Sequence, residues 1–206
     1  MKIICIGRNY AQHAAELGNE IPDEPVIFMK PPSALLVNDK PFFHPEFSED
    51  VHHEIEVVLK VGKNGKSVQP EFAHRYFSEM TLGIDFTARD LQSKQKAKGL
   101  PWEIAKGFDG SAVLGEFVSM NDYDPKNIQF RLEKNGETVQ SGDTSLLLFP
   151  FEEIIVQVSK YFKLQMGDLI YTGTPAGVGP VQPGDELRGF LTTPEGEREL
   201  FFCAVK

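Results

Sequence analysis

The sequence has little positive charge, few cysteines and no long apolar run. Its 30 acidic residues outnumber its 21 basic residues, which gives a formal net charge of −9. Binding to phosphate backbones needs a basic footprint, so this balance argues against nucleic acid as a partner. No apolar run approaches the length of about 20 residues that spans a bilayer, and the apolar start is too short for a signal peptide. We therefore expect a cytosolic protein with no membrane partner.

Cysteine is also scarce, which bears on the redox chemistry of the chain. Cys5 and Cys203 both lie in apolar, strand-like runs. Neither their number nor their spacing suggests a zinc site or a disulfide framework, so we expect two buried, reduced thiols. The chain has 206 residues, of which 41% are hydrophobic and 25% charged. This composition is ordinary for a globular protein, and the length fits one domain over residues 1–206.

Strand-like patterns dominate what is present. The sequence predicts strands at residues 2–6, 26–29, 34–37, 54–61, 81–86, 113–118, 128–133, 168–172, 186–191 and 199–205. Asn135-Gly136 predicts a hairpin with a two-residue loop. Helical patterns are fewer, at residues 9–17, 70–79, 88–98 and 150–162. Because these helices do not alternate regularly with strands, the sequence favours an α+β, mainly β fold with mixed sheets around one core.

Three carboxylates stand out within the apolar runs. In a strand, Glu54 and Glu56 share one face at a separation of about 7 Å, where their charges repel. Asp85 lies in a second apolar run, where an unpaired carboxylate is costly to bury. A hard cation such as Mg²⁺ or Mn²⁺ would resolve both conflicts and leave positions for a chelating 2-oxo acid. On spacing alone the pattern is weak: Glu54 and Glu56 could instead form the solvated face of an edge strand, and Asp85 could cap the helix that starts near Ala88.

Two further features carry possible chemistry. His13 and Glu16 lie three residues apart on a predicted helix, so they form either a proton-transfer dyad or an exposed polar face. Thr174 lies in the turn Thr172-Gly173-Thr174-Pro175, where its hydroxyl or amide could hold a substrate carboxylate. No lysine follows in the pattern of a phosphate-binding loop, so we do not expect nucleotide binding there.

Five blocks of the sequence resemble the fumarylacetoacetate hydrolase superfamily. They occur in the family's order and extend over almost the whole chain: GRNYAQH at 7–13, HHEIE at 52–56, GIDFTARD at 83–90, GLPWEIAKGFD at 99–109 and DLIYTGTPAGVG at 168–179. The pattern is similar to the short branch of acylpyruvate hydrolases and oxaloacetate decarboxylases. That branch overlaps in sequence with 2-hydroxyhepta-2,4-diene-1,7-dioate isomerases.

The resemblance implies a fold, a metal and a reaction. The fold would be a mixed β-sandwich roll with a few peripheral helices, in a homodimer. Glu54, Glu56 and Asp85 would hold Mg²⁺ or Mn²⁺. The reaction would break a C–C bond of a small 2-oxo acid through a metal-bound enolate, by acylpyruvate hydrolysis or oxaloacetate decarboxylation. The alternative is an isomerase or tautomerase of a 2-oxo dioate. A non-enzymatic binding protein would be expected to lack one of the metal ligands or Lys106, yet all are present.

The resemblance also implies roles for other residues. His13 and Glu16 would form a dyad on an active-site lid at residues 8–20, and Lys106 would face the substrate. Beside Thr174, we expect secondary candidates for substrate binding or for shaping the pocket in Lys30, Arg89 and Gln92, although each is also an ordinary surface residue type. Two residues have expectations of their own. Arg8 would tie the lid to the body, and His52, which shares the even-numbered strand face of Glu54 and Glu56, would support the metal ligands from outside.

Overall fold

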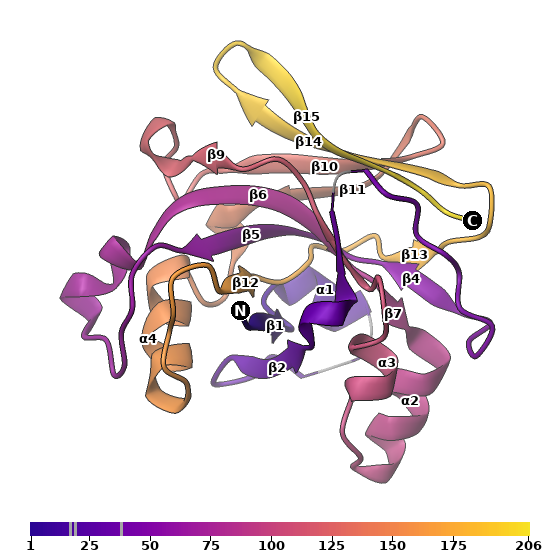
Figure 1. Ribbon diagram of the computed structural model, residues 1–206, viewed down its shortest axis with the longest axis horizontal. Coiled ribbons are helices and arrows are strands. Elements are labelled where there is room, and N and C mark those ends of the chain that lie inside the picture. The colour runs from indigo at the N-terminus through magenta and orange to yellow at the C-terminus, as the bar shows by residue number, and fades with distance from the viewer. Residues whose placement is uncertain (17, 19, 38) are drawn as a thin grey trace.

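The main body of the fold is one curled, mixed sheet. The computed structural model describes residues 1–16, 18, 20–37 and 39–206, and the strands of these residues form three sheets (Figure 1). The largest has the order β2-β1-β12-β5-β6-β8-β3, with β9 paired to β6. β1 runs parallel to β12 and β3 parallel to β8, whereas β5 is antiparallel to both of its neighbours. The bounds are β1 (Ile3–Gly7), β2 (Val26–Lys30), β3 (Leu35–Leu36), β5 (Ile55–Val61), β6 (Phe77–Asp85), β8 (Ala112–Leu114), β9 (Val118–Ser119) and β12 (Leu169–Tyr171).

Two smaller sheets complete the β structure. The four-stranded sheet has the order β11-β10-β14-β15, and the three-stranded sheet has the order β13-β4-β7. In Figure 1 the four-stranded sheet lies above β5 and β6. The bounds are β4 (Val51–His53), β7 (Thr87–Ala88), β10 (Gln129–Lys134), β11 (Glu137–Asp143), β13 (Gly179–Pro180), β14 (Glu186–Thr193) and β15 (Gly196–Ala204).

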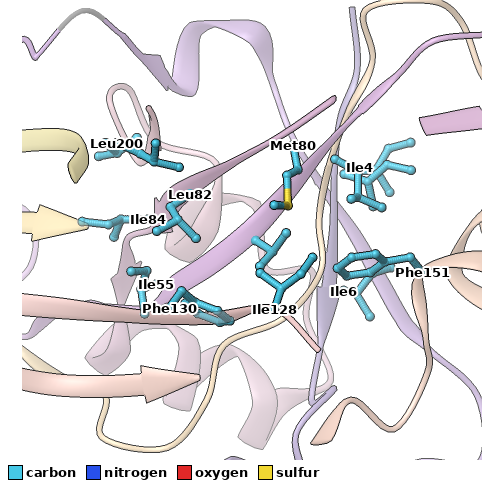
Figure 2. Packing of buried hydrophobic residues seen from close by; sticks show 14 of the residues in the cluster. Ile4, Ile6, Ile55, Met80, Leu82, Ile84, Ile128, Phe130, Phe151 and Leu200 are labelled. Carbon is cyan, nitrogen blue, oxygen red and sulfur yellow. The ribbon is translucent and has the colours of Figure 1, made fainter. Parts of the chain in front are cut away.

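The principal core fills the space between the curled sheet and the four-stranded sheet. Leu82 and Ile84 of β6 belong to one buried cluster with Phe130 of β10 and Leu200 of β15 (Figure 2). Each of these side chains is at most 5% exposed, so the cluster removes a large apolar area from water. The burial of β5 and β6 on both faces explains why their apolar runs are nearly continuous. Glu56 of β5 and Asp85 of β6 lie in this interior.

The helices cover the ends of the curled sheet. They are α1 (Ala11–Glu16), α2 (Arg89–Lys98), α3 (Glu103–Lys106) and α4 (Phe151–Tyr161). α4 buries Phe151, Ile154, Ile155 and Val158, a spacing that places one apolar stripe against the core. No helix in the described part of the chain reaches the length and hydrophobicity that crossing a membrane requires.

α1 is anchored at its start by the side chain of Asn9. Its amide nitrogen donates to the carbonyl groups of Phe149 at 3.0 Å and Thr172 at 2.8 Å. Its amide oxygen accepts from the backbone N–H of Phe149 at 2.7 Å. One buried side chain therefore ties the N-terminal segment to two segments from the C-terminal half of the chain.

The predicted fold class is confirmed, together with most of the predicted elements. The Asn135-Gly136 hairpin is also confirmed: φ is 56° and 84° at these residues, and Lys134 pairs with Glu137. Cys5 and Cys203 are free and buried, as expected. Leu17 at the end of the predicted helix and Asn38 in a predicted turn lie outside the described residues.

Two predicted elements are wrong, and tertiary pairing explains both. The predicted helix at 70–79 is a 3₁₀ helix at Pro70–Tyr76, after which the chain enters β6 at Phe77. Pairing of β6 with β5 outweighs the local helical pattern. The predicted strand at 113–118 is divided into β8 and β9 by a bend at Gly115. A Cβ at Gly115 would lie 2.6 Å from the carbonyl oxygen of Leu200, so only glycine fits there.

Gly83 of β6 has no room for a side chain. A Cβ at this position would lie 2.4 Å from the carbonyl oxygen of Val113 and 2.9 Å from the ring of Tyr171. We expect Gly83→Ala to lower the free energy of unfolding by about 1–3 kcal/mol, because the strands must separate to admit the methyl group. Chemical denaturation would measure this change. Gly62→Ala is the matched control, since the nearest atom to its Cβ is the Ser78 hydroxyl at 3.4 Å. Equal unfolding midpoints for the two variants would contradict the expectation.

Candidate active site and metal centre

Three carboxylates meet where β5 begins and β6 ends. Glu54 links β4 to β5, Glu56 lies in β5, and Asp85 is the last residue of β6. The backbone N–H of Asp85 donates to the carbonyl of Glu54 at 2.9 Å, which holds the two residues side by side. One oxygen from each carboxylate lies within 4.8 Å of the others, and all three residues are at most 5% exposed. β5 has neighbours on both sides, so these glutamates are not the solvated face of an edge strand.

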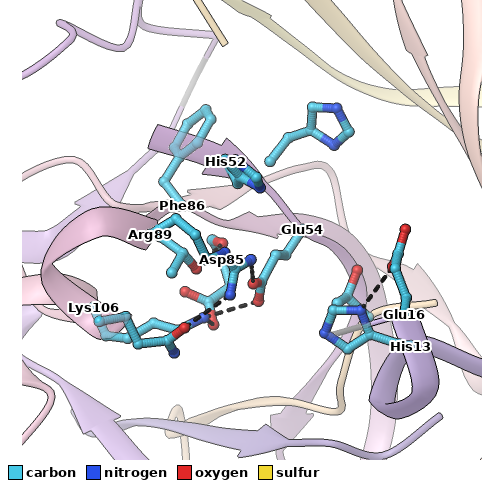
Figure 3. A network of polar contacts seen from close by, with 12 residues as sticks. His13, Glu16, His52, Glu54, Asp85, Phe86, Arg89 and Lys106 are labelled. Carbon is cyan, nitrogen blue, oxygen red and sulfur yellow. Dashed lines mark hydrogen bonds and ion pairs between the residues drawn. The ribbon is translucent and has the colours of Figure 1, made fainter. Parts of the chain in front are cut away.

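Three cationic side chains surround two of the carboxylates. Lys106 donates to Glu54 at 2.8 Å and to Asp85 at 2.7 Å, and Arg89 contacts the other oxygen of Glu54 (Figure 3). Lys30 contacts the other oxygen of Asp85 at 2.7 Å. Burial by itself would raise the pKa of Glu54, but Lys106 and Arg89 hold that pKa well below its ordinary value. Glu54 is therefore an anion at neutral pH.

Glu56 differs from the other two carboxylates because no cation contacts it among the described residues. Its carboxylate accepts a hydrogen bond from the backbone N–H of Gly173 at 2.6 Å. Burial, followed by the charges of Asp85 and Glu54, raises the pKa of Glu56 well above its ordinary value. The protein therefore brings three carboxylates together, and its cations contact only two of them. A divalent cation that prefers oxygen ligands would give Glu56 a positive partner, so the donor set fits Mg²⁺ or Mn²⁺.

His13 and Glu16 of α1 form a pair beside these carboxylates. The Nδ1 atom of His13 lies 3.3 Å from a carboxylate oxygen of Glu16. Figure 3 shows this pair beside the contacts of Glu54 with its cations. Glu16 also accepts from the backbone N–H of Gly177 at 3.1 Å. Burial lowers the pKa of His13, although the nearby Glu54 and Glu16 oppose the shift. A neutral imidazole whose Nδ1–H donates to a carboxylate has an unprotonated Nε2, which can accept a proton.

Gln140 of β11 is a buried hub that the sequence analysis missed. Its side-chain oxygen accepts from the backbone N–H of Ile55 at 3.1 Å, which fixes the orientation of the amide. Its nitrogen then donates to the hydroxyl oxygen of Thr174 and to the carbonyl of Pro175, both at 2.9 Å. Because the Thr174 oxygen accepts this bond, its own hydrogen is available to a ligand. Strand alternation could have placed Gln140 on a buried face with Gly142, but it gives no sign of these partners.

The cavity beside the carboxylates is narrow, with a volume of about 30 Å³. This is room for an ion and a water molecule, and the walls are mostly charged or polar. The predicted candidates Arg89, Gln92 and Thr174 all line it. The full set of lining residues is Ile6, Gly7, Arg8, His13, Phe28, Glu54, Glu56, Asp85, Arg89, Gln92, Lys96, Trp102, Lys106 and Thr174.

Lys30 is not among the lining residues. Its ammonium lies behind Asp85, where it also donates to the carbonyl groups of Phe86 at 3.2 Å and Ser111 at 3.1 Å. The side chain is fully buried, since Lys30 ends β2 and points into the interior. A direct substrate contact, one of the roles predicted for Lys30, does not fit this position. Lys30 instead contacts Asp85 from the side that faces away from the cavity.

His52 also differs from expectation. The sequence placed it on the face of Glu54 and Glu56, but its ring contacts Asp50 at 2.8 Å rather than any of the three carboxylates. The alternation argument fails because the chain changes sheets after His53: β4 belongs to the three-stranded sheet and β5 to the curled sheet. The neighbouring His53 contacts Gln140 at 2.8 Å.

A family comparison gives this geometry its context. The model of the fumarylacetoacetate (FAA) hydrolase C-terminal domain matches residues 2–193. The chain belongs to the fumarylacetoacetate hydrolase family. The protein is thus an enzyme of this family, and the resemblance drawn from the five sequence blocks is confirmed.

Relatives with names illustrate the range of the fumarylacetoacetate hydrolase family. A mitochondrial oxaloacetate decarboxylase of Dictyostelium discoideum is 43% identical, over 93% of this chain and 88% of its own. An oxaloacetate tautomerase of Escherichia coli is 40% identical, over 90% of this chain and 86% of its own. The crystal structure of fumarylpyruvate hydrolase from Pseudomonas aeruginosa, in complex with Mn²⁺ and pyruvate, is similar with a TM-score of 0.92 at 34% identity. The match extends over 100% of this chain and 89% of the Pseudomonas aeruginosa chain.

Proposed function

We propose that this protein is a divalent-metal-dependent enzyme that breaks a C–C bond of a small 2-oxo acid. The reaction would be acylpyruvate hydrolysis or oxaloacetate decarboxylation, through an enolate. The observation that carries the proposal is the buried cluster of Glu54, Glu56 and Asp85, which lines the same cavity as His13 and Lys106. A relative solved with Mn²⁺ and pyruvate, and another named as an oxaloacetate decarboxylase, support both the metal and the substrate class.

The three carboxylates would hold Mg²⁺ or Mn²⁺. Such an ion, when bound, polarises a 2-oxo group and stabilises negative charge on its oxygen. Lys30 and Arg89 would act as positioning residues, because they fix the carboxylates of Asp85 and Glu54 respectively. Lys106 lies between the same two carboxylates, where its ammonium can stabilise the charge of an enolate.

Thr174 and Gln92 would bind the substrate through neutral polar groups. The hydroxyl hydrogen of Thr174 is available to a carboxylate because Gln140 occupies the oxygen as a donor. Gln92 lines the cavity, and its side-chain oxygen accepts from Arg89 at 2.8 Å, which leaves its NH₂ group to donate. Both residues therefore present donors to an anionic ligand.

His13 would act as the general base in the hydrolytic reaction. Its Nε2 accepts a proton from the water that attacks the distal carbonyl carbon, and Glu16 stabilises the imidazolium that forms. The position of α1 supports this role, because it places His13 on the cavity wall and lets Glu16 accept from the backbone N–H of Gly177. A lid at residues 8–20 is part of the proposal; residues 17 and 19 lie outside the described part of the chain. Decarboxylation needs no attacking water, so the dyad should matter less for that reaction.

A second candidate function is tautomerisation or isomerisation of a 2-oxo dioate, such as oxaloacetate. The observation that favours it is the contact of His13 Nδ1 with Glu16, which in a neutral ring leaves Nε2 able to move a proton without any bond cleavage. The Escherichia coli relative named as an oxaloacetate tautomerase supports this candidate. Both functions use the same carboxylate cluster and differ only in whether a C–C bond breaks.

The deciding experiment is to measure pyruvate release from acetylpyruvate and from oxaloacetate. Each assay is run with Mg²⁺, with chelator, and with Mg²⁺ but no enzyme, since free metal ions also decarboxylate oxaloacetate. Metal-dependent release above the enzyme-free rate supports C–C cleavage, and the ratio of the two rates names the main reaction. No release from either substrate, in protein that binds Mg²⁺, would reject cleavage. Conversion of enol to keto oxaloacetate, followed by absorbance, would then test the second candidate.

Gln140 offers a test of how Thr174 is oriented. Gln140→Leu removes the donor to Thr174 and leaves the backbone N–H of Ile55 without its acceptor. We expect the free energy of unfolding to fall by about 1–3 kcal/mol. We also expect KM to rise more than kcat falls, because Thr174 loses its fixed orientation toward the ligand. Gln129→Leu, at an exposed glutamine on the neighbouring strand, is the control. A fall in stability with KM unchanged would show a structural role alone.

Two expectations from the sequence stay predictions. A homodimer is one of them, and a cytosolic location is the other. The Dictyostelium discoideum relative is named as mitochondrial, which differs from the cytosolic location predicted for this chain.

A further inference from the structure

The cavity contains more cations than its carboxylates require. Arg8, Arg89, Lys96 and Lys106 all line it. Arg89 and Lys106 contact Glu54, as described above. Among the described residues, no carboxylate contacts the side chain of Arg8 or of Lys96, although both face the same cavity as Glu54. Two of the four cations are therefore available to a ligand.

Arg8 is held in an unusual backbone conformation. Its φ is 59°, in the left-handed region that residues other than glycine rarely adopt. The conformation is set between Gly7 at the end of β1 and the anchored side chain of Asn9. The Nε atom of Arg8 is buried without a hydrogen-bond partner. Strained, unpartnered groups of this kind concentrate where a ligand binds.

Lys96 enters the cavity from α2. Its ammonium lies over the ring of Trp102, 5.4 Å from the centroid, and Trp102 also lines the cavity. Burial, followed by repulsion from Arg8, Arg89 and Lys106, lowers the pKa of Lys96 to about 8, while Glu54 opposes the shift. The cations are thus close enough to repel one another, and an anion between them would relieve that repulsion.

The charges in the cavity indicate how many negative groups a ligand should carry. Lys30, Arg89 and Lys106 already offset the three carboxylates. A divalent cation would add two positive charges, of which the carboxylate of a 2-oxo acid neutralises one. Arg8 and Lys96 add further positive charge on the same cavity. A monoanionic ligand leaves this charge unbalanced, whereas a dianionic ligand reduces it.

We propose that Arg8 and Lys96 form a second carboxylate-binding subsite, which selects 2-oxo dicarboxylates over 2-oxo monocarboxylates. The subsite rests on the proposed function, because the first carboxylate must be held at the metal centre. Arg8 would provide directional N–H donors, and Lys96 a point charge on the wall formed by α2. The subsite ranks oxaloacetate or a longer 2-oxo dioate above acetylpyruvate as the substrate.

The test compares two ligands that differ only at the distal end. Binding of 2-oxoglutarate and of 2-oxopentanoate is measured by calorimetry with Mg²⁺ present, for the wild type, Lys96→Gln and Arg8→Gln. We expect the wild type to prefer 2-oxoglutarate by about tenfold or more, and each variant to lose most of this preference. Affinity for 2-oxopentanoate should change by less than about threefold. Lys98→Gln, on the same helix but exposed and outside the cavity, should keep the preference.

Two outcomes would overturn the subsite. One is equal wild-type affinity for both ligands, and the other is a variant that weakens both ligands equally while its melting temperature is unchanged. The kcat/KM values for oxaloacetate and acetylpyruvate separate this failure from a failure of the proposed function. Turnover without ligand preference rejects the subsite alone. Preference in the binding assay without turnover rejects the proposed reaction and leaves the subsite in place.

Discussion

Glu56→Gln is expected to remove metal binding while leaving the metal-free protein as stable as the wild type, or more stable. Glu56 is the carboxylate of the cluster that no cation contacts among the described residues, and it lies beside two other buried anions. Replacing it by a neutral amide of similar shape removes that repulsion. The same change removes one of three ligands, so the affinity for Mg²⁺ should fall by about a hundredfold or more.

Thermal unfolding with and without Mg²⁺ measures both effects. A ligand present at 100 times its Kd stabilises the folded state by about 2.7 kcal/mol, and the variant should lose this gain. The order of stability should therefore reverse: the variant is equal or higher without metal, and the wild type is higher with metal. Glu79→Gln, at a half-exposed glutamate of β6 that pairs with Lys60, is the control. The same Mg²⁺-induced shift in the variant and the wild type would remove Glu56 from the metal site.

His13→Ala is expected to abolish acylpyruvate cleavage and to leave metal binding intact. Loss of a positioned general base costs about 10²–10⁴-fold in rate. His13 contacts Glu16 rather than any of the three carboxylates, so the Mg²⁺-induced shift in melting temperature should persist. Oxaloacetate decarboxylation should fall much less, because it consumes no activated water. His74→Ala, at an exposed histidine, is the control. Unchanged cleavage of acetylpyruvate by His13→Ala would exclude His13 from the mechanism.

The same imidazole predicts the acid side of the pH profile. Burial lowers the pKa of His13 below 6.5, and only the neutral ring can accept a proton. The kcat/KM for acylpyruvate should therefore hold as pH falls to 6.5 and decline at lower pH, as the ring becomes charged. Glu16 raises this pKa, so Glu16→Gln should move the decline to still lower pH. A decline centred above pH 6.5 would contradict this assignment. The measurement is the initial rate at low substrate concentration across pH 4.5–8.

The grouping of the three carboxylates could be predicted from the sequence, although spacing alone left other interpretations open and the family resemblance decided between them. Glu54, Glu56 and Asp85 sit inside apolar runs, and charged residues there need partners. The order of the strands did not matter to that inference, only their burial. The fold class followed from similar reasoning, since few helices alternate with strands. The partners of these carboxylates could not be obtained in the same way, because Lys30 and Arg89 come from distant elements.

Other features depended on contacts that no local pattern carries. Gln140 resembles any polar strand residue until the four-stranded sheet places it against Ile55 and Thr174. Lys30 was a candidate for the pocket and otherwise an ordinary surface residue type, whereas in the structure it ends β2 and is fully buried. The predicted helix at 70–79 failed for the opposite reason. Its local pattern was helical, but pairing with β5 decides the structure from Phe77 onward.

The short helix α1 gives the affinity of this site an entropic component. α1 has six residues, far fewer than the about 12–15 that an isolated helix needs, so it depends on its two anchors. Asn9 fixes its start, and the bond from Gly177 to Glu16 fixes its end. Molecules in which the second anchor is broken cannot present His13 to a ligand. For a substrate that needs His13, the apparent Kd is then the intrinsic Kd divided by the fraction of closed molecules. Weakening this anchor should raise KM by that factor for every such substrate, whatever its charge.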